Sequence, residues 1–160
     1  MTLKQTLLAL TLLLTFSFQT IARESVPIIE HNNIPVITGS GKALSAEQVR
    51  SAIASAAASN QWEISKDSTG DVIVATLFVR GKHTVVVAIP YSPEKFSINY
   101  QSSINMNYDV SKRTSSSYPG TFNGNAGIKN LADGTPVIHP FYNKWVGILL
   151  SAIEADLKAR

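Results

Sequence analysis

Hydrophobic positions between residues 45 and 60 repeat with the period of an α-helix. Ser45 stands before the first turn and Gln48 follows three residues later, which is the spacing of a capping box. The pattern predicts a helix over 46–59 that ends at Asn60. Its apolar stripe consists of Val49, Ile53, Ala56 and Ala57.

The next part of the chain has the composition and alternation of β-strands. The strongest segment reads DVIVATLFV, the following one reads TVVVAI, and the last alternates apolar and polar residues. Pro90 and Pro93 end the third segment. The four predicted strands are 62–66, 71–79, 84–89 and 96–101, with turns at 67–70 and 80–82.

The last stretch of the chain predicts a second helix. Pro140 suits the first turn of a helix, and Lys158 and Arg160 suit its C-terminal end. Before it, residues 102–136 are crowded with Ser, Asn and Gly and predict a long flexible loop, with an insertion at about 110–136. The apolar positions of this helix are Tyr142, Trp145, Val146, Leu149, Ile153 and Leu157.

These elements predict an α+β fold. We expect an antiparallel sheet of three or four strands with two helices on one face, in the order α-β-β-β-β-α. Residues 41–160 would form this single domain, with the Ser/Asn/Gly-rich loop before the last helix. Residues 23–40 contain two short apolar runs, each with a proline, and predict extended edge segments.

The two strongest strands are apolar on both faces, whereas 96–101 has one apolar and one polar face. An antiparallel sheet with helices on one face normally shows water a polar second face. Either another part of the chain covers Val86 and Ala88, or these residues bind a partner. We expect cover by the N-terminal segment or by the later loop. The alternative is a binding surface, which would also allow a homodimer.

Residues 1–22 have the three regions of a secretory signal peptide. Lys4 supplies the basic region, 7–18 the apolar region, and small residues precede a cut after Ala22. An uncleaved membrane anchor is the weaker alternative, because the apolar stretch is interrupted by Thr and Ser and is shorter than the roughly 20 residues of a membrane span. We therefore expect a periplasmic or secreted chain that begins at Arg23.

Composition narrows the class of protein. The chain has 160 residues, 44% of them hydrophobic and 16% charged, which is typical of one globular domain. The absence of cysteine excludes disulfides, thiolate metal sites and the lipid anchor of a bacterial lipoprotein. A formal net charge of +3 is too small to indicate a nucleic-acid partner.

Four short motifs occur in order along the chain. They are Gly41-Lys42-Ala43-Leu44, Ile89-Pro90-Tyr91-Ser92, Tyr100-x-x-Ser103-x-Asn105-Met106-x-Tyr108 and Ile138-His139-x-x-Tyr142-Asn143-x-Trp145-Val146. Together with the order of the predicted elements, they resemble a family of small bacterial envelope proteins of unknown activity, many of them lipoproteins. The resemblance covers about 41–157 and implies an α+β envelope domain, without an activity. This chain departs from the family in lacking the lipid-bearing cysteine and in the insertion at about 110–136.

Catalytic and metal-binding motifs are missing from the sequence. No serine lies in a G-x-S-x-G sequence, and His31, His83 and His139 are too far apart for metal-ligand spacing. We therefore predict a protein that is not an enzyme and needs no cofactor or metal. A metal site assembled in space stays open as an alternative.

Two polar and aromatic motifs flank the predicted loop and are the best candidate for a ligand site. Their hydroxyl, amide, imidazole and aromatic groups are those that bind a sugar or a peptide. Structural roles are the alternative, in which Asn105 holds a turn and His139 caps the last helix. The candidate residues are Ser103, Asn105, Tyr108, His139, Tyr142 and Asn143.

Two functions are compatible with these patterns. The first is a non-catalytic envelope protein that binds another protein or an envelope component, through the sheet face or the region of residues 103–108. The second is a small-molecule or glycan binder, or as a weaker option a hydrolase, at the cluster near Asn105 and His139.

Overall fold

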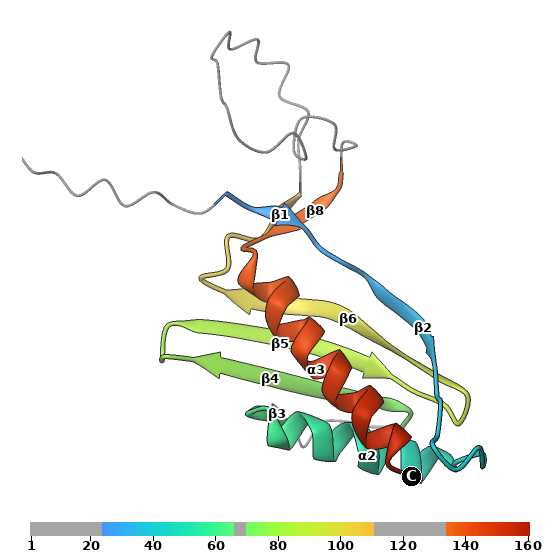
Figure 1. The fold of residues 1–160 in the computed structure, drawn as a ribbon. Helices are drawn as coiled ribbons and strands as arrows, with labels where there is room; N and C mark the ends of the chain where they lie inside the picture. The colour runs from blue at the N-terminus through green and yellow to red at the C-terminus, as the bar shows by residue number, and fades with distance from the viewer. Residues whose placement is uncertain (1–23, 66–69, 111–133) are drawn as a thin grey trace, which may run out of the picture.

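The computed structural model describes residues 24–65, 70–110 and 134–160 (Figure 1). It confirms an α+β fold with two helices and antiparallel sheets. A five-stranded main sheet has the order β2-β6-β5-β4-β3, and a small sheet has the order β1-β8-β7. In chain order the elements are β1 (Val26–Pro27), β2 (His31–Pro35), α2 (Ala46–Ser59), β3 (Trp62–Ile64), β4 (Val72–Val79), β5 (His83–Pro90), β6 (Lys95–Ile104), β7 (Asp109–Val110), β8 (Pro136–Ile138) and α3 (Phe141–Lys158).

The main sheet is built around a hairpin of two eight-residue strands, β4 and β5. Arg80 and Gly81 close this hairpin with φ angles of 53° and 62°. Two successive positive φ angles give the turn whose twist matches that of the strands. β6 pairs with the other side of β5, and the register shifts between Val86 and Val87, which marks a bulge. β2 and the three-residue β3 form the two edges of the sheet.

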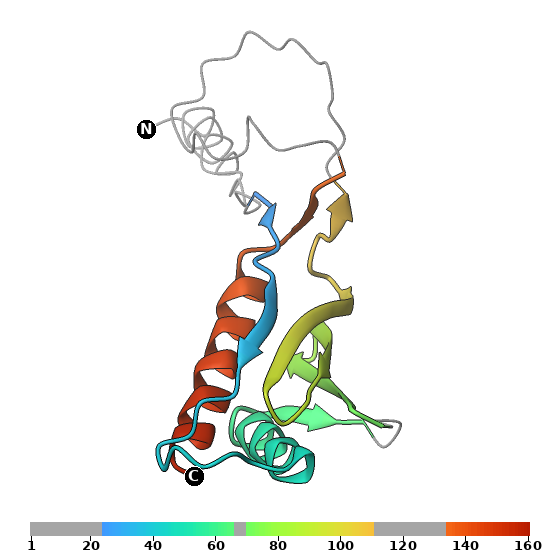
Figure 2. The same ribbon diagram turned by 90° about the vertical axis from the view of Figure 1, so that its right-hand side faces the viewer.

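Both helices lie on one face of the main sheet (Figures 1 and 2). α2 confirms the predicted helix residue for residue, and its capping box is present, with Ser45 Oγ accepting from Gln48 N and Gln48 Oε1 accepting from Ser45 N. α2 packs against α3 and beside β3. Between the helices and the sheet lies one hydrophobic core, whose fully buried side chains include Ile53, Ile73, Val87, Phe96, Leu149 and Ile153.

The strand count and the strand order correct the prediction. The N-terminal segment forms β1 and β2 at the edges of the two sheets, which agrees with the predicted extended edge segments, but β2 raises the main sheet to five strands instead of three or four. Residues 102–104 belong to β6, and 109–110 and 136–138 form β7 and β8, although the sequence predicts loop there. β1 pairs with β8 across most of the length of the chain, so no local pattern reveals these strands. The predicted signal peptide at 1–22, the predicted turn at 67–69 and residues 111–133 of the predicted insertion lie outside the described residues.

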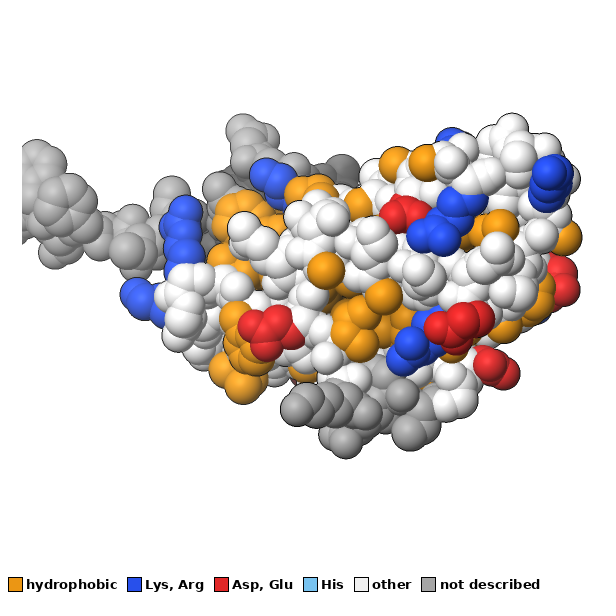
Figure 3. All heavy atoms as spheres, turned by 90° about the horizontal axis from the view of Figure 1, so that it is seen from below, with side chains coloured by type: hydrophobic (Ala, Val, Ile, Leu, Met, Phe, Trp, Pro, Cys, Tyr) orange, Lys and Arg blue, Asp and Glu red, His pale blue; other side chains and the backbone are white. Residues whose placement is uncertain are grey.

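The side of the molecule that carries α2 is shown in Figure 3. Charged side chains are scattered there among uncharged polar ones, and hydrophobic side chains form separate patches. In the described part of the chain, no polar or charged residue is fully buried. None of the helices in those same ranges combines the length and the apolar character that a membrane span requires.

Candidate functional site

Asn105 is one of the predicted site residues whose polar groups bond within the protein. It follows β6 with a φ of 57°, and its Nδ2 donates to the Lys82 carbonyl oxygen at 2.6 Å. The Nδ1 atom of His83 lies 2.8 Å from the Asn105 carbonyl oxygen. Asn105 therefore joins the end of β6 to the turn between β4 and β5.

His139 and Asn143 hold the start of α3. The Phe141 amide donates to His139 Nδ1 at 3.2 Å, and the N-cap residue Pro140 offers no side-chain acceptor. Asn143 Nδ2 donates to the Pro27 carbonyl oxygen at 2.8 Å, and Asn143 Oδ1 accepts from Ile29 N at 3.0 Å. The Asn143 amide thus fastens the N-terminal segment to the first turn of α3.

Tyr142 and Ser103 both contact Tyr100 on β6. Tyr142 is buried and meets Tyr100 edge-on, with 5.7 Å between the ring centroids. Burial, and after it the neighbouring Tyr100, raises the pKa of Tyr142 above its ordinary value of 10. Because its ring is buried against the core, Tyr142 serves packing. Ser103 Oγ lies 3.1 Å from the Tyr100 hydroxyl.

Tyr108 differs from the other predicted residues because it lines an open cleft. It is 43% exposed and stacks on Tyr100, with 4.4 Å between ring centroids. The two rings line a cleft of about 260 Å³ beside the N-terminal segment. Glu30 and Asn32 line the same cleft, and Asn32 Nδ2 donates to Glu30 Oε2 at 2.8 Å. The remaining lining residues are Ile28, Ile98, Asn99 and Pro136.

The sequence did not point to Glu30, Asn32 or Asn99 as members of this cleft. They come from the N-terminal segment and from β6, which are brought together only by long-range strand pairing. The groups in the cleft are of the kinds that bind a sugar. An aromatic ring can contact the apolar face of the sugar. A carboxylate and amides can form hydrogen bonds with its hydroxyl groups.

The three histidines do not form a common site, and two of them contact aromatic rings. His83 lies beside Trp145 with 6.4 Å between ring centroids, and His139 lies beside Phe141 at 5.0 Å. Burial lowers the pKa of His31 below its ordinary value. Within the described ranges, no three His, Asp or Glu side chains come together as metal ligands.

The second candidate site is the outer face of the main sheet, formed by the side chains of β3 to β6 that point away from the helices. The register places Phe78 beside Thr84, and Thr84 beside Ile104, on this face. Phe78 is 55% exposed and Ile104 is 60% exposed. Figure 2 shows α3 on one side of the sheet and no described element on the other. The apolar residues of the outer face are Val72, Val74, Phe78, Val86, Ala88 and Ile104.

The described part of the N-terminal segment does not cover this face, because β2 pairs with β6 within the sheet. The expected cover by the later loop stays a prediction, since residues 111–133 lie outside the described residues. The remaining positions of the outer face are mainly Thr, Ser and Asn. Its charged residues lie at the margins, with Glu63 on the edge strand β3 and Lys95 at the start of β6. The centre of the outer face is therefore apolar and uncharged.

Comparison with known proteins gives no indication of a function, so the proposal depends on the geometry of the two candidate sites. No family model, no curated protein and no solved structure matches this chain.

Proposed function

We propose that this chain is an exported, non-catalytic protein that binds another protein through the outer face of its main sheet. The exposure of Phe78 and Ile104 on this face is the observation that carries the proposal. Burying apolar surface stabilises a complex by about 25 cal/mol per Å², so large exposed apolar side chains on a flat sheet favour association. The hydrophobic residues on both faces of β4 and β5 support the same view.

The chemistry of the outer face defines the partner. Its centre has no charged side chain, so a partner with a strongly charged surface would lose hydration without gaining an ion pair there. A partner with an apolar, uncharged patch would bury Phe78, Val86 and Ile104 without that cost. The signal-peptide pattern at 1–22 and the resemblance to envelope proteins support a partner in the periplasm or outside the cell.

Site-specific photocrosslinking in the native cells tests this proposal. A photoreactive phenylalanine analogue at Val86 on the outer face should give a discrete adduct, whereas the same analogue at the exposed Ser55 of α2 should not. Phe78→Lys should abolish the Val86 adduct while leaving the melting temperature of the dilute, monomeric chain unchanged within about 2 °C, because Phe78 is 55% exposed. The measured mass of the purified protein should be that of a chain whose first residue is Arg23. Equal adducts at Val86 and Ser55 would contradict the proposal.

The tyrosine cleft supports a second candidate function, the binding of a small molecule or glycan. The observation that favours it is the open ring of Tyr108 beside Glu30 and Asn32 in a cleft of about 260 Å³. That volume is slightly below the range of about 300–1,000 Å³ of most small-molecule sites and suits one or two sugar rings.

A titration with N,N′-diacetylchitobiose, followed by amide NMR shifts, tests the second candidate. Shifts should gather at the cleft and should be lost in Tyr108→Ala. Phe141→Ala removes another exposed aromatic ring, outside the cleft, and should leave the shifts in place. Shifts that survive Tyr108→Ala would rule out this cleft as the binding site.

A further inference from the structure

We infer that the partner of the outer face is a second copy of this chain, packed face to face with its strands running in the opposite direction. The inference rests on the proposed function, because both use the same face. It adds the identity of the partner and the orientation in which that partner binds.

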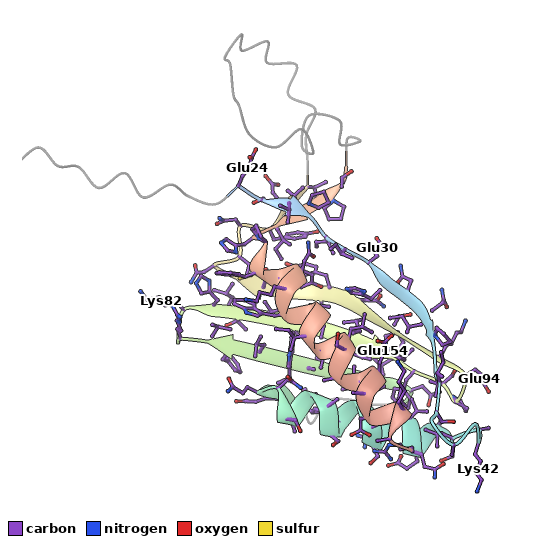
Figure 4. All side chains as sticks on the ribbon, viewed as in Figure 1. Glu24, Glu30, Lys42, Lys82, Glu94 and Glu154 are labelled. Carbon is purple, nitrogen blue, oxygen red and sulfur yellow. The ribbon has the colours of Figure 1, made fainter. Side chains whose placement is uncertain are left out.

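The charged residues at the two ends of the β4–β5–β6 sheet differ in sign. Arg80 and Lys82 are exposed at the turn between β4 and β5. Asp71 and Glu94 are exposed at the opposite end, before β4 and before β6. Figure 4 labels Lys82 and Glu94 at opposite ends of the sheet. We call these the basic end and the acidic end.

Lys95 is a basic residue next to the acidic end, and it is already engaged. Its Nζ donates to Asn33 Oδ1 on the edge strand β2 at 2.9 Å. This bond to a neutral amide leaves Lys95 charged, and Glu94 Oε2 in turn accepts from Ser92 Oγ at 2.9 Å. Two carboxylates, Asp71 and Glu94, against one ammonium, Lys95, still give this end a net charge of −1. The basic end has no acidic residue in its turn, which consists of Arg80, Gly81 and Lys82.

Symmetry selects the orientation of the second copy. Two identical sheets that pack face to face are related by a two-fold axis that lies in the interface. An axis parallel to the strands would place the basic end on the partner's basic end, and like charges would repel. An axis across the strands places the basic end of each copy on the acidic end of the other, so the attraction occurs twice.

The same orientation matches the apolar residues along β4. Phe78 lies near the basic end of β4 and Val72 near the acidic end, both on the outer face. Reversal of the strand direction brings the Phe78 of each copy over the partner's Val72. Glu63 pairs with Thr76 near the middle of β4, so the same axis brings the two Glu63 side chains together at the rim of the interface. Solvent and salt screen their repulsion there.

The outer face is large enough for a specific dimer. Strands lie about 4.8 Å apart and rise about 3.3 Å per residue, so eight residues on each of β4, β5 and β6 and the three residues of β3 cover roughly 430 Å². Two such faces contribute roughly 860 Å² of flat area, and the accessible area of protruding side chains is larger than this flat area. A specific interface needs about 1,000 Å² in total.

Charge reversal at the two ends tests the inference. Sedimentation equilibrium of the purified full chain should show a monomer–dimer equilibrium. Arg80→Glu/Lys82→Glu and Asp71→Lys/Glu94→Lys should each weaken the dimer by about tenfold or more, because both ends of each homodimer then carry like charges. An equimolar mixture of the two variants should restore dimers, because both ends of the heterodimer then pair opposite charges.

The outcomes separate this inference from the proposed function. A wild-type chain that stays monomeric, or a mixture that does not regain dimers, overturns the inference. If the wild type is monomeric but Val86 still crosslinks to a different protein, the proposed function stands and only the identity of the partner is wrong. If the wild type is monomeric and Phe78→Lys lowers its melting temperature, the chain covers its own outer face and both ideas fail.

Two further measurements keep the test valid. The single changes Lys82→Glu and Glu94→Lys replace the double variants if either of those does not fold, as judged by circular dichroism. Raising the NaCl concentration should reduce the difference between the wild type and the variants, because salt screens exposed charges over about 8 Å at 0.15 M ionic strength. A difference that does not change with salt would contradict a role of charge in the orientation.

Discussion

Asn143 bonds to two backbone groups of the N-terminal segment with the two ends of one side-chain amide. Nδ2 donates to Pro27 O and Oδ1 accepts from Ile29 N. Asn143→Ala removes both hydrogen bonds, and we expect the free energy of unfolding to fall by about 1–2 kcal/mol. Hydrogen exchange at the Ile29 amide should become faster, since its acceptor is lost.

Asn143→Asp is the matched control for this prediction. The aspartate keeps an oxygen acceptor for Ile29 N but cannot donate to Pro27 O. We therefore expect the Ile29 amide to stay protected in Asn143→Asp and to lose protection in Asn143→Ala. Equal exchange rates at Ile29 in the wild type and in Asn143→Ala would show that the side chain does not hold the N-terminal segment.

At the scale of the elements, the helices are predicted well and the short strands are not. Ser45 and Gln48 cap α2 through groups three residues apart, so the local sequence contains the whole signal. β7 and β8 have two and three residues, and their partners lie far away in the chain. Such strands exist because of tertiary pairing, which residue type alone does not specify.

α3 contains a glycine in its interior, and this gives a prediction at the same scale. Apart from its chain neighbours and the nearby backbone of α3 itself, no described atom lies within 4 Å of the position that a Cβ on Gly147 would take. Alanine loses less backbone entropy than glycine on forming a helix, so Gly147→Ala should raise the free energy of unfolding by about 0.5–1 kcal/mol. Urea denaturation followed by circular dichroism measures this change.

Ala155→Gly provides the opposite change at an exposed position of the same helix. It should lower the free energy of unfolding by about 1 kcal/mol. A loss of stability in Gly147→Ala would mean that a neighbouring part of the chain packs so closely on α3 that position 147 cannot carry a side chain.

Across the whole molecule, the two candidate sites were predictable to different degrees. Successive residues of a strand point to opposite faces, so the composition of both faces can be read from the strand's own sequence. The apolar residues on both faces of β4 and β5 therefore indicate an unusual outer face. The tyrosine cleft could not be predicted as a unit. Tyr108 is within its predicted cluster, but Glu30 and Asn32 reach the cleft only because β2 pairs with β6.

The path from β2 to α2 passes close to the end of α3, and Gly39 marks the contact. A Cβ on Gly39 would meet the Lys158 carbonyl oxygen at less than a van der Waals distance, and this oxygen belongs to the backbone, which cannot rotate away as a side chain can. Gly39→Ala should therefore force the connection and the helix end apart and lower the free energy of unfolding by about 1–3 kcal/mol. Ser40→Ala changes the neighbouring exposed residue and removes only a long, exposed hydrogen bond from Lys42 N to Ser40 Oγ (3.3 Å), which water can replace, so it should alter the same free energy by less than about 0.5 kcal/mol. Urea denaturation of both variants measures the difference, and the wild-type slope should be kept in Gly39→Ala because the same surface is exposed on unfolding. A Gly39→Ala variant as stable as Ser40→Ala would show that the N-terminal connection does not rest on the end of α3.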